Sequence, residues 1–385
     1  MKIFKYFLLS IILLKLSSFG LTYFGTTVGS LLNSLLFSCL LVYYFLSTKP
    51  KLPLVFIVLG LVYFLISGLN YSGVLRDYFM DFIKYFIFIL GVSSLTKDTS
   101  TNELSVFAFI GAMSVLVNAV IFSTPYGRYG GFYINPNDAG LVCLIAFSLT
   151  FYVEHIVLKL FLQLLLVTAG IMTLSRYFIL ILILVNLIAV ISHKKNSLGL
   201  ITGTIGIVVV LTLSSLFNLN TTRFVAFKSV FGNEEIETRT ISEGSRSETW
   251  ALYKDVILKN PVSGIGYKAL HGEQISNYSN VKVNVGVHNT YLMAIGESGI
   301  ITFLLFILIY ISLIIRSVKH LKSNPEYACI AAVLTTYLLV SHNYFDNYFV
   351  LFTSVWLYQR VKKSPYSFDQ IEEEEEFKPN NILNP

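Results

Sequence analysis

Charge and cysteine are both scarce in this sequence of 385 residues. Only 13% of the residues are charged, about half the share found in soluble globular domains, and 55% are hydrophobic. The three cysteines, Cys39, Cys143 and Cys329, all lie inside apolar runs, which is typical of small core residues and not of a disulfide framework or a metal site. The shortage of charge excludes a soluble globular domain and predicts an all-α polytopic membrane protein.

Several common catalytic motifs are also missing from the sequence. It has no Walker loop, no dinucleotide fingerprint, no Gly-x-Ser-x-Gly elbow and no HExxH. No Asp-x-Asp stands in the segments expected outside, so a metal-dependent sugar transferase is not indicated. We expect no cofactor, no bound metal and no nucleic-acid partner.

Apolar runs recur along most of the chain. A bilayer-spanning helix needs about twenty apolar residues, and by this measure we expect about twelve spans, with the tight junctions at 155–158 and 174–176 leaving the number open by one or two. The first run is expected to be a retained helix, because it lacks a small-residue cleavage site and many spans follow it. The expected spans are 3–21, 25–46, 52–70, 74–95, 104–123, 138–154, 158–174, 176–192, 198–218, 288–316, 327–342 and 344–360.

The distribution of Lys and Arg predicts the orientation. With the N-terminus inside, the cytoplasmic segments hold fourteen basic residues, whereas the short outer connections hold Arg76, Arg128 and Arg176 alone. Both termini are therefore expected in the cytoplasm. The expected organisation is nine spans over 1–218, a large outer loop over 219–287, three spans over 288–360 and an acidic, disordered tail over 361–385.

The outer loop is far longer than any other connection. Loops of more than about 15 residues tend to be functional or disordered. Because Trp250, Tyr253 and Ile257 recur at helical spacing, we expect this loop to be folded.

The arginines, unlike the lysines, concentrate on the outer side. Orientation requires positive charge inside and does not explain arginine outside. A guanidinium group binds phosphate or carboxylate through two parallel hydrogen bonds, which lysine cannot do. An anionic ligand, with phosphate as the leading candidate, explains the pattern; the alternative is that these arginines reach lipid headgroups or pair with loop acids. Six of the eight arginines are expected outside: Arg76, Arg128, Arg176, Arg223, Arg239 and Arg246.

Arg246 has the most specific local setting of these arginines. Ser245 and Glu248 have the spacing of a capping box, so a helix is expected to begin there and to end before Pro261. Arg246 then lies in the first turn, where free backbone N–H groups favour an anion. The alternative is an interfacial helix on which Arg246 is merely solvated.

Two further arginines lie beside predicted outer turns. Arg176 begins an apolar helix, a position where a charge is costly unless it faces a wet cavity or a partner. Arg128 precedes a turn that contains Asn137. This turn either places Arg128 and Asn137 at a site or forms a helix start capped by Asn137 or Asp138, and the cap interpretation is favoured.

Two His-Asn pairs are also expected outside. His288 and Asn289 end the long loop where the next span begins, and an imidazole at such a half-buried position can remove a proton from a hydroxyl group. The alternative is an interfacial residue that caps the helix. His342 is a second candidate with a lower rank, because it lies in a tight turn crowded with aromatic residues.

Four stretches in this order resemble the O-antigen ligase/polymerase superfamily of bacterial envelope glycan assembly, over roughly residues 120 to 345. They are GRYGGFYINPNDAG, TLSRYFIL, RSETWALYKDVILKNPVSGIGY and VHNTYLMAIGESGIITFLLFILIY. The resemblance implies a GT-C-like membrane glycosyltransferase with about twelve helices. It also implies metal-free, inverting transfer from an undecaprenyl-pyrophosphate-linked oligosaccharide at the outer (periplasmic) face of the inner membrane.

Carried over by motif, the resemblance assigns donor pyrophosphate binding to Arg246, Arg176 and Arg128, and activation of the acceptor hydroxyl to His288. Asn289, Asn137 and His342 become acceptor or supporting residues. We favour a polymerase of O-antigen or capsule repeats; the alternatives are a ligase acting on lipid A core or protein and, from another class, a lipid-linked glycan transporter. The implied partners are membrane lipids, a chain-length regulator and a flippase.

Overall fold

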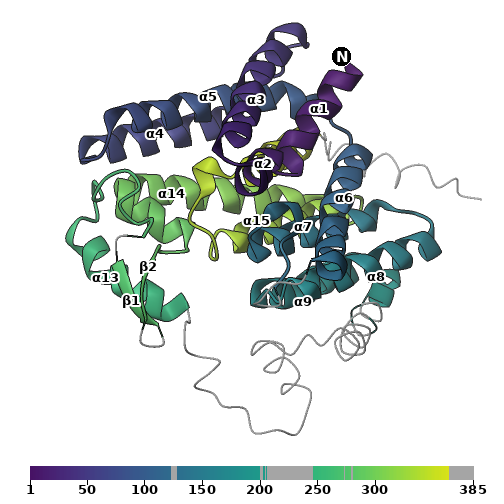
Figure 1. The fold of residues 1–385 in the computed structure, drawn as a ribbon. Coiled ribbons are helices and arrows are strands. Elements are labelled where there is room, and N and C mark those ends of the chain that lie inside the picture. The colour runs from purple at the N-terminus through teal and green to yellow at the C-terminus, as the bar shows by residue number, and fades with distance from the viewer. Residues whose placement is uncertain are drawn as a thin grey trace, which may run out of the picture.

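The computed structural model describes residues 1–122, 128–199, 203, 205, 246–272, 274–278 and 281–363. These residues are mainly helical, as expected, and add one short antiparallel hairpin (Figure 1). The helices and strands are α1 (Lys2–Leu13), α2 (Leu16–Phe24), α3 (Thr26–Leu46), α4 (Leu54–Leu69), α5 (Leu75–Asp98), α6 (Thr101–Ile121), α7 (Pro136–Leu149), α8 (Ile156–Met172), α9 (Arg176–Ser192), α13 (Arg246–Lys259), β1 (Gln274–Tyr278), β2 (Val281–Val285), α14 (Thr290–Lys319), α15 (Pro325–Tyr337) and α16 (Tyr348–Lys363).

Helix α7 is the central element of the bundle, since every residue from Asp138 to Leu149 is buried. It packs against α6, α8, α9 and α15, whereas α14 packs against α4, α15 and α16. Figure 1 shows α3, α4 and α5 on one side of α14 and α15, and α8 and α9 on the other. The centre of the fold therefore combines helices that follow one another in the sequence, such as α6, α7 and α8, with partners from distant parts of the chain, such as α7 with α15 and α4 with α14.

Wherever the structure describes an expected span, one or more helices overlap it. Four helices, α3, α5, α6 and α14, are long and apolar enough to cross a membrane, and α1 with α2 adds a fifth if this bent pair is one span. Others, such as the fully buried α7 and the 13-residue α15, are shorter than the roughly 20 residues of a full span. The expected span 198–218 lies almost wholly outside the described residues, so the total of twelve stays a prediction.

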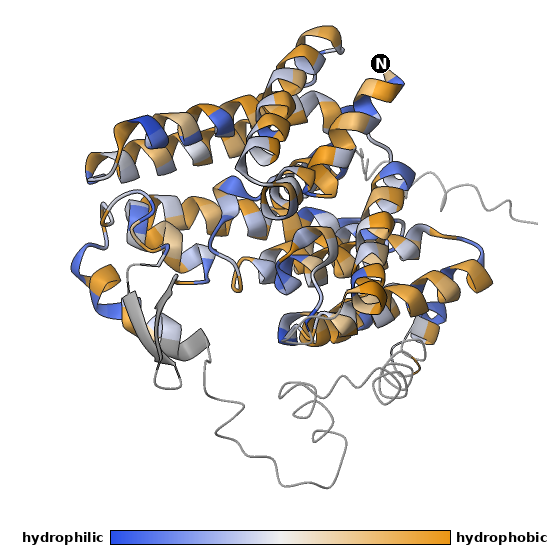
Figure 2. Cartoon of the chain, in the orientation of Figure 1, coloured by the Kyte–Doolittle hydropathy of each residue, from blue (hydrophilic) through white to orange (hydrophobic). Residues whose placement is uncertain are grey.

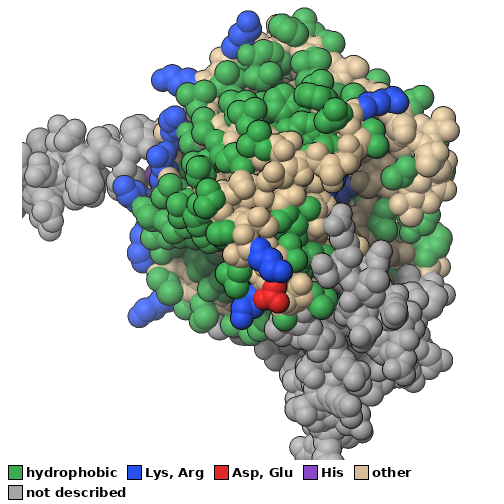
Figure 3. All heavy atoms as spheres, turned by 90° about the vertical axis from the view of Figure 1, so that its left-hand side faces the viewer, with side chains coloured by type: hydrophobic (Ala, Val, Ile, Leu, Met, Phe, Trp, Pro, Cys, Tyr) green, Lys and Arg blue, Asp and Glu red, His purple; other side chains and the backbone are tan. Residues whose placement is uncertain are grey.

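The outer surface of the bundle is apolar. Leu65, Leu180 and Leu308 are each more than 60% exposed, and many other large hydrophobic side chains on several helices share this property. Figure 2 shows hydrophobic residues along nearly all the helices, and Figure 3 shows one face that they dominate, with Lys and Arg mostly towards its edges. An apolar surface of this extent is typical of a protein that lies in a membrane.

The first expected span, 3–21, is broken and not continuous. Helices α1 and α2 meet at an angle of 63°, and Lys15 between them has a left-handed backbone with φ 49°. A left-handed conformation is unfavourable for a residue with a side chain and is seldom kept without a compensating interaction. The sequence shows no glycine or proline at this break.

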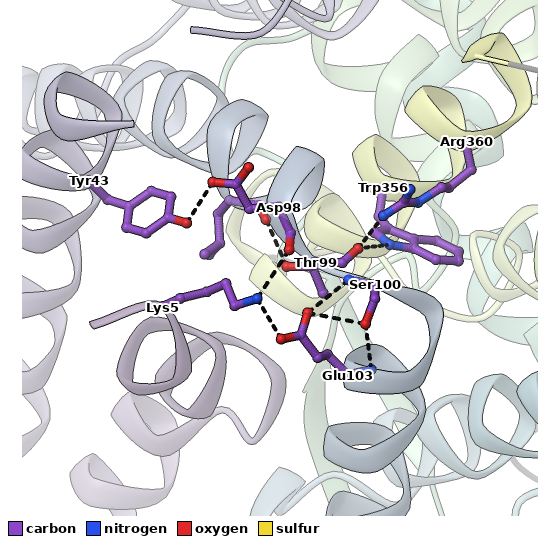
Figure 4. A network of polar contacts seen from close by, with 9 residues as sticks. Lys5, Tyr43, Asp98, Thr99, Ser100, Glu103, Trp356 and Arg360 are labelled. Atoms are coloured by element: carbon purple, nitrogen blue, oxygen red, sulfur yellow. Dashed lines mark hydrogen bonds and ion pairs between the residues drawn. The ribbon is translucent and has the colours of Figure 1, made fainter. Parts of the chain in front are cut away.

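One end of the bundle gathers residues that the charge distribution places in the cytoplasm (Figure 4). Lys5 of α1 forms an ion pair with Glu103 of α6 and donates to the backbone oxygen of Asp98. Arg360 and Trp356 of α16 both donate to the backbone oxygen of Thr99. The start of α1, the connection between α5 and α6, and the end of α16 are thus joined at one end of the bundle, and all three are expected on the cytoplasmic side.

The segment before α14 is folded where the structure describes it. As expected, α13 ends at Lys259, before Pro261, and its face with Tyr253 and Ile257 is buried. This helix packs on α14 and lies beside the hairpin in Figure 1. Residues 219–245 of the expected outer loop, which include Ser245, fall outside the described residues, as does the acidic tail from residue 364 onward.

Candidate functional site

Helix α7 begins at a turn that binds an arginine. Asn135 caps the helix by accepting from the backbone N–H of Asn137, and Pro136 occupies the first turn, where its missing N–H has no cost. The expectation that Asn137 or Asp138 is the cap is therefore wrong. Because Asn135 takes the cap position, the Asn137 side chain is available for other contacts.

Asn137 joins Arg128 to the start of α9. Its Oδ1 accepts from Arg128 Nη2 at 3.4 Å and from the Ser175 hydroxyl at 3.0 Å. Arg128 Nε also donates to the backbone oxygen of Thr173 at 3.2 Å. The structure thus brings together Arg128, Asn137 and the residue directly before Arg176.

Arg176 occupies the first position of α9, with an exposed side chain. Its neighbour Tyr177 is buried and donates to the backbone oxygen of Val333 in α15 at 2.7 Å. The helix is therefore anchored beside the Arg128 turn while the arginine faces outward. The backbone of Arg246 begins α13, as expected, but its side chain is outside the described part of the molecule.

A buried ionic network lies directly beside Asn137. Asp138 forms an ion pair with Lys15 at 2.5 Å, and their side chains are 8% and 12% exposed. The Tyr337 hydroxyl also donates to Asp138, and Asn347 donates to Tyr337 at 3.4 Å. This network explains the break at Lys15, because the ammonium group there reaches the only acid in the first turn of α7.

The C-terminal end of α15 connects this region to the start of α14. Thr290 donates through its backbone to Leu338 at 2.7 Å and through its hydroxyl to the backbone oxygen of Ser341 at 2.8 Å. Tyr291 donates to the backbone oxygen of Thr335. The N-terminal ends of α7, α9 and α14 therefore meet around the end of α15, and the arginine turn and His288 lie at the same end of the bundle.

His288 stands just before α14 with a left-handed backbone, φ 47°. Asn289 caps the helix, since its Oδ1 accepts from the backbone N–H groups of Tyr291 and Leu292. The cap of α14 is therefore Asn289, and not His288 as the alternative interpretation of the sequence had it. It packs edge to face on His342 with ring centroids 4.6 Å apart, and His342 packs in the same way on His271 at 4.8 Å.

The three rings form a row from three separate segments of the chain, which we call the histidine row: His271, His342 and His288. His342 belongs to the connection between α15 and α16, and His271 to the loop after α13. His271 Nε2 lies 3.6 Å from a carboxylate oxygen of Glu297, which is fully buried in α14. The row thus runs from a half-exposed imidazole to a buried acid.

The loop 260–272 wraps around an irregular point in α14. Gly299 has φ 79°, which interrupts the helix and leaves the carbonyl groups before it without their usual partners. The backbone N–H groups of Ile265 and Gly266 donate to the carbonyl oxygens of Gly296 and Glu297 at 2.8 and 3.2 Å. The loop and the helix therefore complete each other's backbone hydrogen bonding.

Burial, with help from neighbouring positive charges, disfavours the protonated form of His271. Burial, followed by the charges of Lys268 and His288, lowers its pKa to about 4. Burial opposes the charge of Lys268 as well, but Asp346 and Asp81 outweigh this effect and raise the pKa of Lys268. His271, Lys268 and Asp346 line a small pocket together with Tyr63, Tyr267, Met293, His342, Asn343 and Phe345.

Several contributors to this region were not identified from the sequence. Asp81 contacts Lys84 of its own helix at 3.2 Å, but it also binds Lys268 and Tyr267 from the distant loop. Glu297 and Lys15 carried a signal that was available, because each is an ionisable residue inside an apolar run. His271 gave no local signal. Among the described residues, no group of His, Cys, Asp or Glu is arranged to hold a metal ion.

The fold and this region define a helical membrane protein with a polar site at one end of its bundle. The model of the O-antigen ligase family matches residues 161–307, which include Arg176, Arg246 and His288 but not Arg128. This match confirms the resemblance to the O-antigen ligase/polymerase superfamily, whose members are membrane glycosyltransferases or ligases acting on lipid-linked glycans. No curated protein matches the chain.

Proposed function

We propose that this protein is a polymerase of O-antigen or capsular polysaccharide that uses an undecaprenyl-pyrophosphate-linked glycan as donor. The acceptor is a lipid-linked repeat unit, and the transfer is inverting and independent of metal. The observation that carries the proposal is the convergence of the Arg128–Asn137–Ser175 turn, the start of α9 and His288 around the end of α15. In this arrangement the arginines can bind the pyrophosphate of the donor while His288 acts on the hydroxyl group of the acceptor.

The proposed location of the site is the periplasmic face of the inner membrane, with both termini in the cytoplasm. The excess of Lys and Arg in the expected inner segments supports this orientation. The network of Lys5, Glu103 and Arg360 supports it further, because these residues meet at one end of the bundle without any of the site residues. The site then lies where a lipid-linked donor and a second glycan chain can both reach it.

In the proposed donor site, Arg128 and Arg176 bind the pyrophosphate and Arg246 joins them from the outer loop. Asn137 and the Thr173 carbonyl orient the Arg128 guanidinium before the donor arrives. Such preorganised cations stabilise the charge that develops on the departing pyrophosphate, and loss of one donor of this kind costs on the order of 2.7–4 kcal/mol in the barrier. Pyrophosphate is already a good leaving group, so charge stabilisation and orientation are the main requirements.

In the proposed acceptor site, His288 removes the proton from the attacking hydroxyl. Its half-exposed position and its unusual backbone, φ 47°, support a functional role, since such strain persists at sites where the surrounding structure requires it. Asn289 supports His288 by fixing the start of α14, and His342 supports it by contact with the ring. The proton passes to the imidazole as the oxygen forms the new glycosidic bond.

A ligase is the second candidate, because the matching family model is described as O-antigen ligase. A ligase shares the donor and the chemistry and differs in the acceptor, which is lipid A core or protein. The proposed polymerase depends on a flippase to deliver its substrates and on a chain-length regulator, whereas the ligase receives a finished chain.

The surface glycan profile of a deletion strain, complemented with the wild type or with His288→Ala, tests the proposal. Loss of the ladder with a single repeat still attached to its anchor supports the polymerase. Loss of all attached glycan, with long chains on undecaprenyl pyrophosphate, assigns the ligase instead. An unchanged profile in the deletion strain contradicts both activities.

A further inference from the structure

A carboxylate two turns into α14 connects this helix with α4 and with the loop 260–272. One oxygen of Glu297 accepts from the Tyr63 hydroxyl of α4 at 2.5 Å, and the other accepts from the backbone N–H of Leu270 at 3.1 Å. The second oxygen also faces His271 Nε2 at 3.6 Å. A fully buried acid with this many directed contacts holds its surroundings in one geometry.

Two paths of contact lead from this carboxylate to His288. Along the backbone, Leu270 donates to Glu297 through its N–H and accepts from the Val287 N–H at 3.0 Å, and Val287 directly precedes His288. Through side chains, His271 faces Glu297 and begins the histidine row that ends at His288. A change at Glu297 can therefore reach His288 both through the backbone and through the side chains.

Close packing around the row limits its movement. A side-chain carbon at Gly286 would stand 2.7 Å from His342 Nε2, which leaves no room for the ring to retreat in that direction. A similar carbon at Gly264 would meet the backbone carbonyl of Glu297 at 2.3 Å, so the loop lies directly on α14. The position of His288 therefore depends on how the loop 260–272 sits on Glu297.

We propose that Glu297 and His271 are positioning residues for His288: they fix the loop 260–272 and the histidine row so that the His288 imidazole faces the acceptor hydroxyl. This inference rests on the proposed role of His288 as the base. Glu297 itself does not touch substrate, because it is 0% exposed. A misplacement of about 1 Å at a reacting group can cost about 100-fold in rate.

The test combines transfer kinetics with the chemical reactivity of His288. In Glu297→Ala we expect kcat to fall by about 100-fold with little change in the KM for donor, because the arginines are held by other contacts. Glu297→Gln retains an oxygen for the Leu270 N–H and an amide that donates to the Tyr63 hydroxyl, so it should recover most of the activity. Glu326→Ala is the matched control, since Glu326 is 1% exposed but contacts Asn324 before α15, away from the row.

Modification with diethylpyrocarbonate reads the position of His288 without any transfer assay. Trypsin cleavage after Lys and Arg separates the row into three peptides, 269–282, 283–316 and 323–360, each with one histidine. We expect His288 to react faster in Glu297→Ala and in His271→Asn than in the parent, and at the parental rate in Glu326→Ala. His271→Asn keeps the test usable if Glu297→Ala does not fold, which the thermal unfolding midpoint in detergent reveals.

The two proposals fail in different ways. Equal reactivity of His288 in all variants, or equal loss of activity in Glu297→Gln and Glu297→Ala, overturns the positioning role. Normal transfer by His288→Ala, with altered reactivity of His288 in Glu297→Ala, instead overturns the role of His288 as base and leaves the geometry of the row supported.

Discussion

The ion pair between Lys15 and Asp138 offers a quantitative test of the region where the arginine turn begins. Both side chains are almost completely buried, and Lys15 occupies a left-handed backbone position to reach its partner. Removal of one member of a buried pair leaves an uncompensated charge and costs about 3–5 kcal/mol. Replacement of both members by neutral groups of similar size is often close to neutral.

We therefore expect Lys15→Met and Asp138→Asn each to lower the free energy of unfolding by about 3 kcal/mol, at the low end of that range. For Lys15→Met the lower value is expected because Tyr337 still donates to the Asp138 carboxylate, whose place in the first turn of α7 also favours a negative charge. For Asp138→Asn it is expected because the Lys15 side chain is still 12% exposed and reaches water more readily. The double variant should lose less than either single one, which gives a coupling energy of more than about 3 kcal/mol in a double-mutant cycle.

Exposure of Cys143 to a thiol reagent in mixed micelles provides the assay, since this cysteine is fully buried in α7. Lys5 and Glu103 form a control pair of the same length with side chains 13% and 19% exposed, at the opposite end of the bundle. Variants of the Lys15 pair should also weaken donor binding through the neighbouring Asn137, whereas variants of the control pair should alter stability alone. Additive losses in the cycle would refute the reasoning.

Three further outcomes follow from the geometry of the site. Arg128→Lys should raise the KM for donor about tenfold or more, because an ammonium group cannot reproduce the contacts with Asn137 and the Thr173 carbonyl; an unchanged KM would exclude Arg128 from the donor site. Gly286→Ala should lower kcat and leave donor KM unchanged, since the new methyl group displaces His342. The pKa of His271 is about 4 in the folded protein and 6.5 for a free histidine, so between these two pH values the unfolded chain binds more protons than the folded one. Stability should therefore rise from pH 4 to 6.5, and this rise should be smaller in His271→Gln.

The sequence predicts most helices well, because a run of about twenty apolar residues is a local and strong signal. The start of α14 at the His288–Asn289 pair and the end of α13 before Pro261 were likewise predictable from neighbouring residues. The break between α1 and α2 was not, since neither glycine nor proline marks it. It depends on Lys15 reaching an acid that lies 123 residues further along the chain.

The contacts that assemble the site are similarly distant in sequence. Tyr63 and Glu297 are 234 residues apart, and no local pattern pairs them. The choice of Asn135 over Asn137 as the cap of α7 shifts the helix start by two residues, and cap preference alone does not resolve it because both residues are asparagine. The sequence thus indicates which residue types matter at this end of the bundle, whereas packing determines their partners.

Transfer by purified His288→Ala, with a defined lipid-linked donor and acceptor, tests the central claim most directly. The same preparation should be assayed for donor binding, so that loss of chemistry is separated from loss of substrate. The proposed mechanism predicts that donor binding is retained and that transfer falls by about 100-fold or more, as expected for the loss of a general base. Transfer at the parental rate with donor bound would contradict the assignment of His288 as the base.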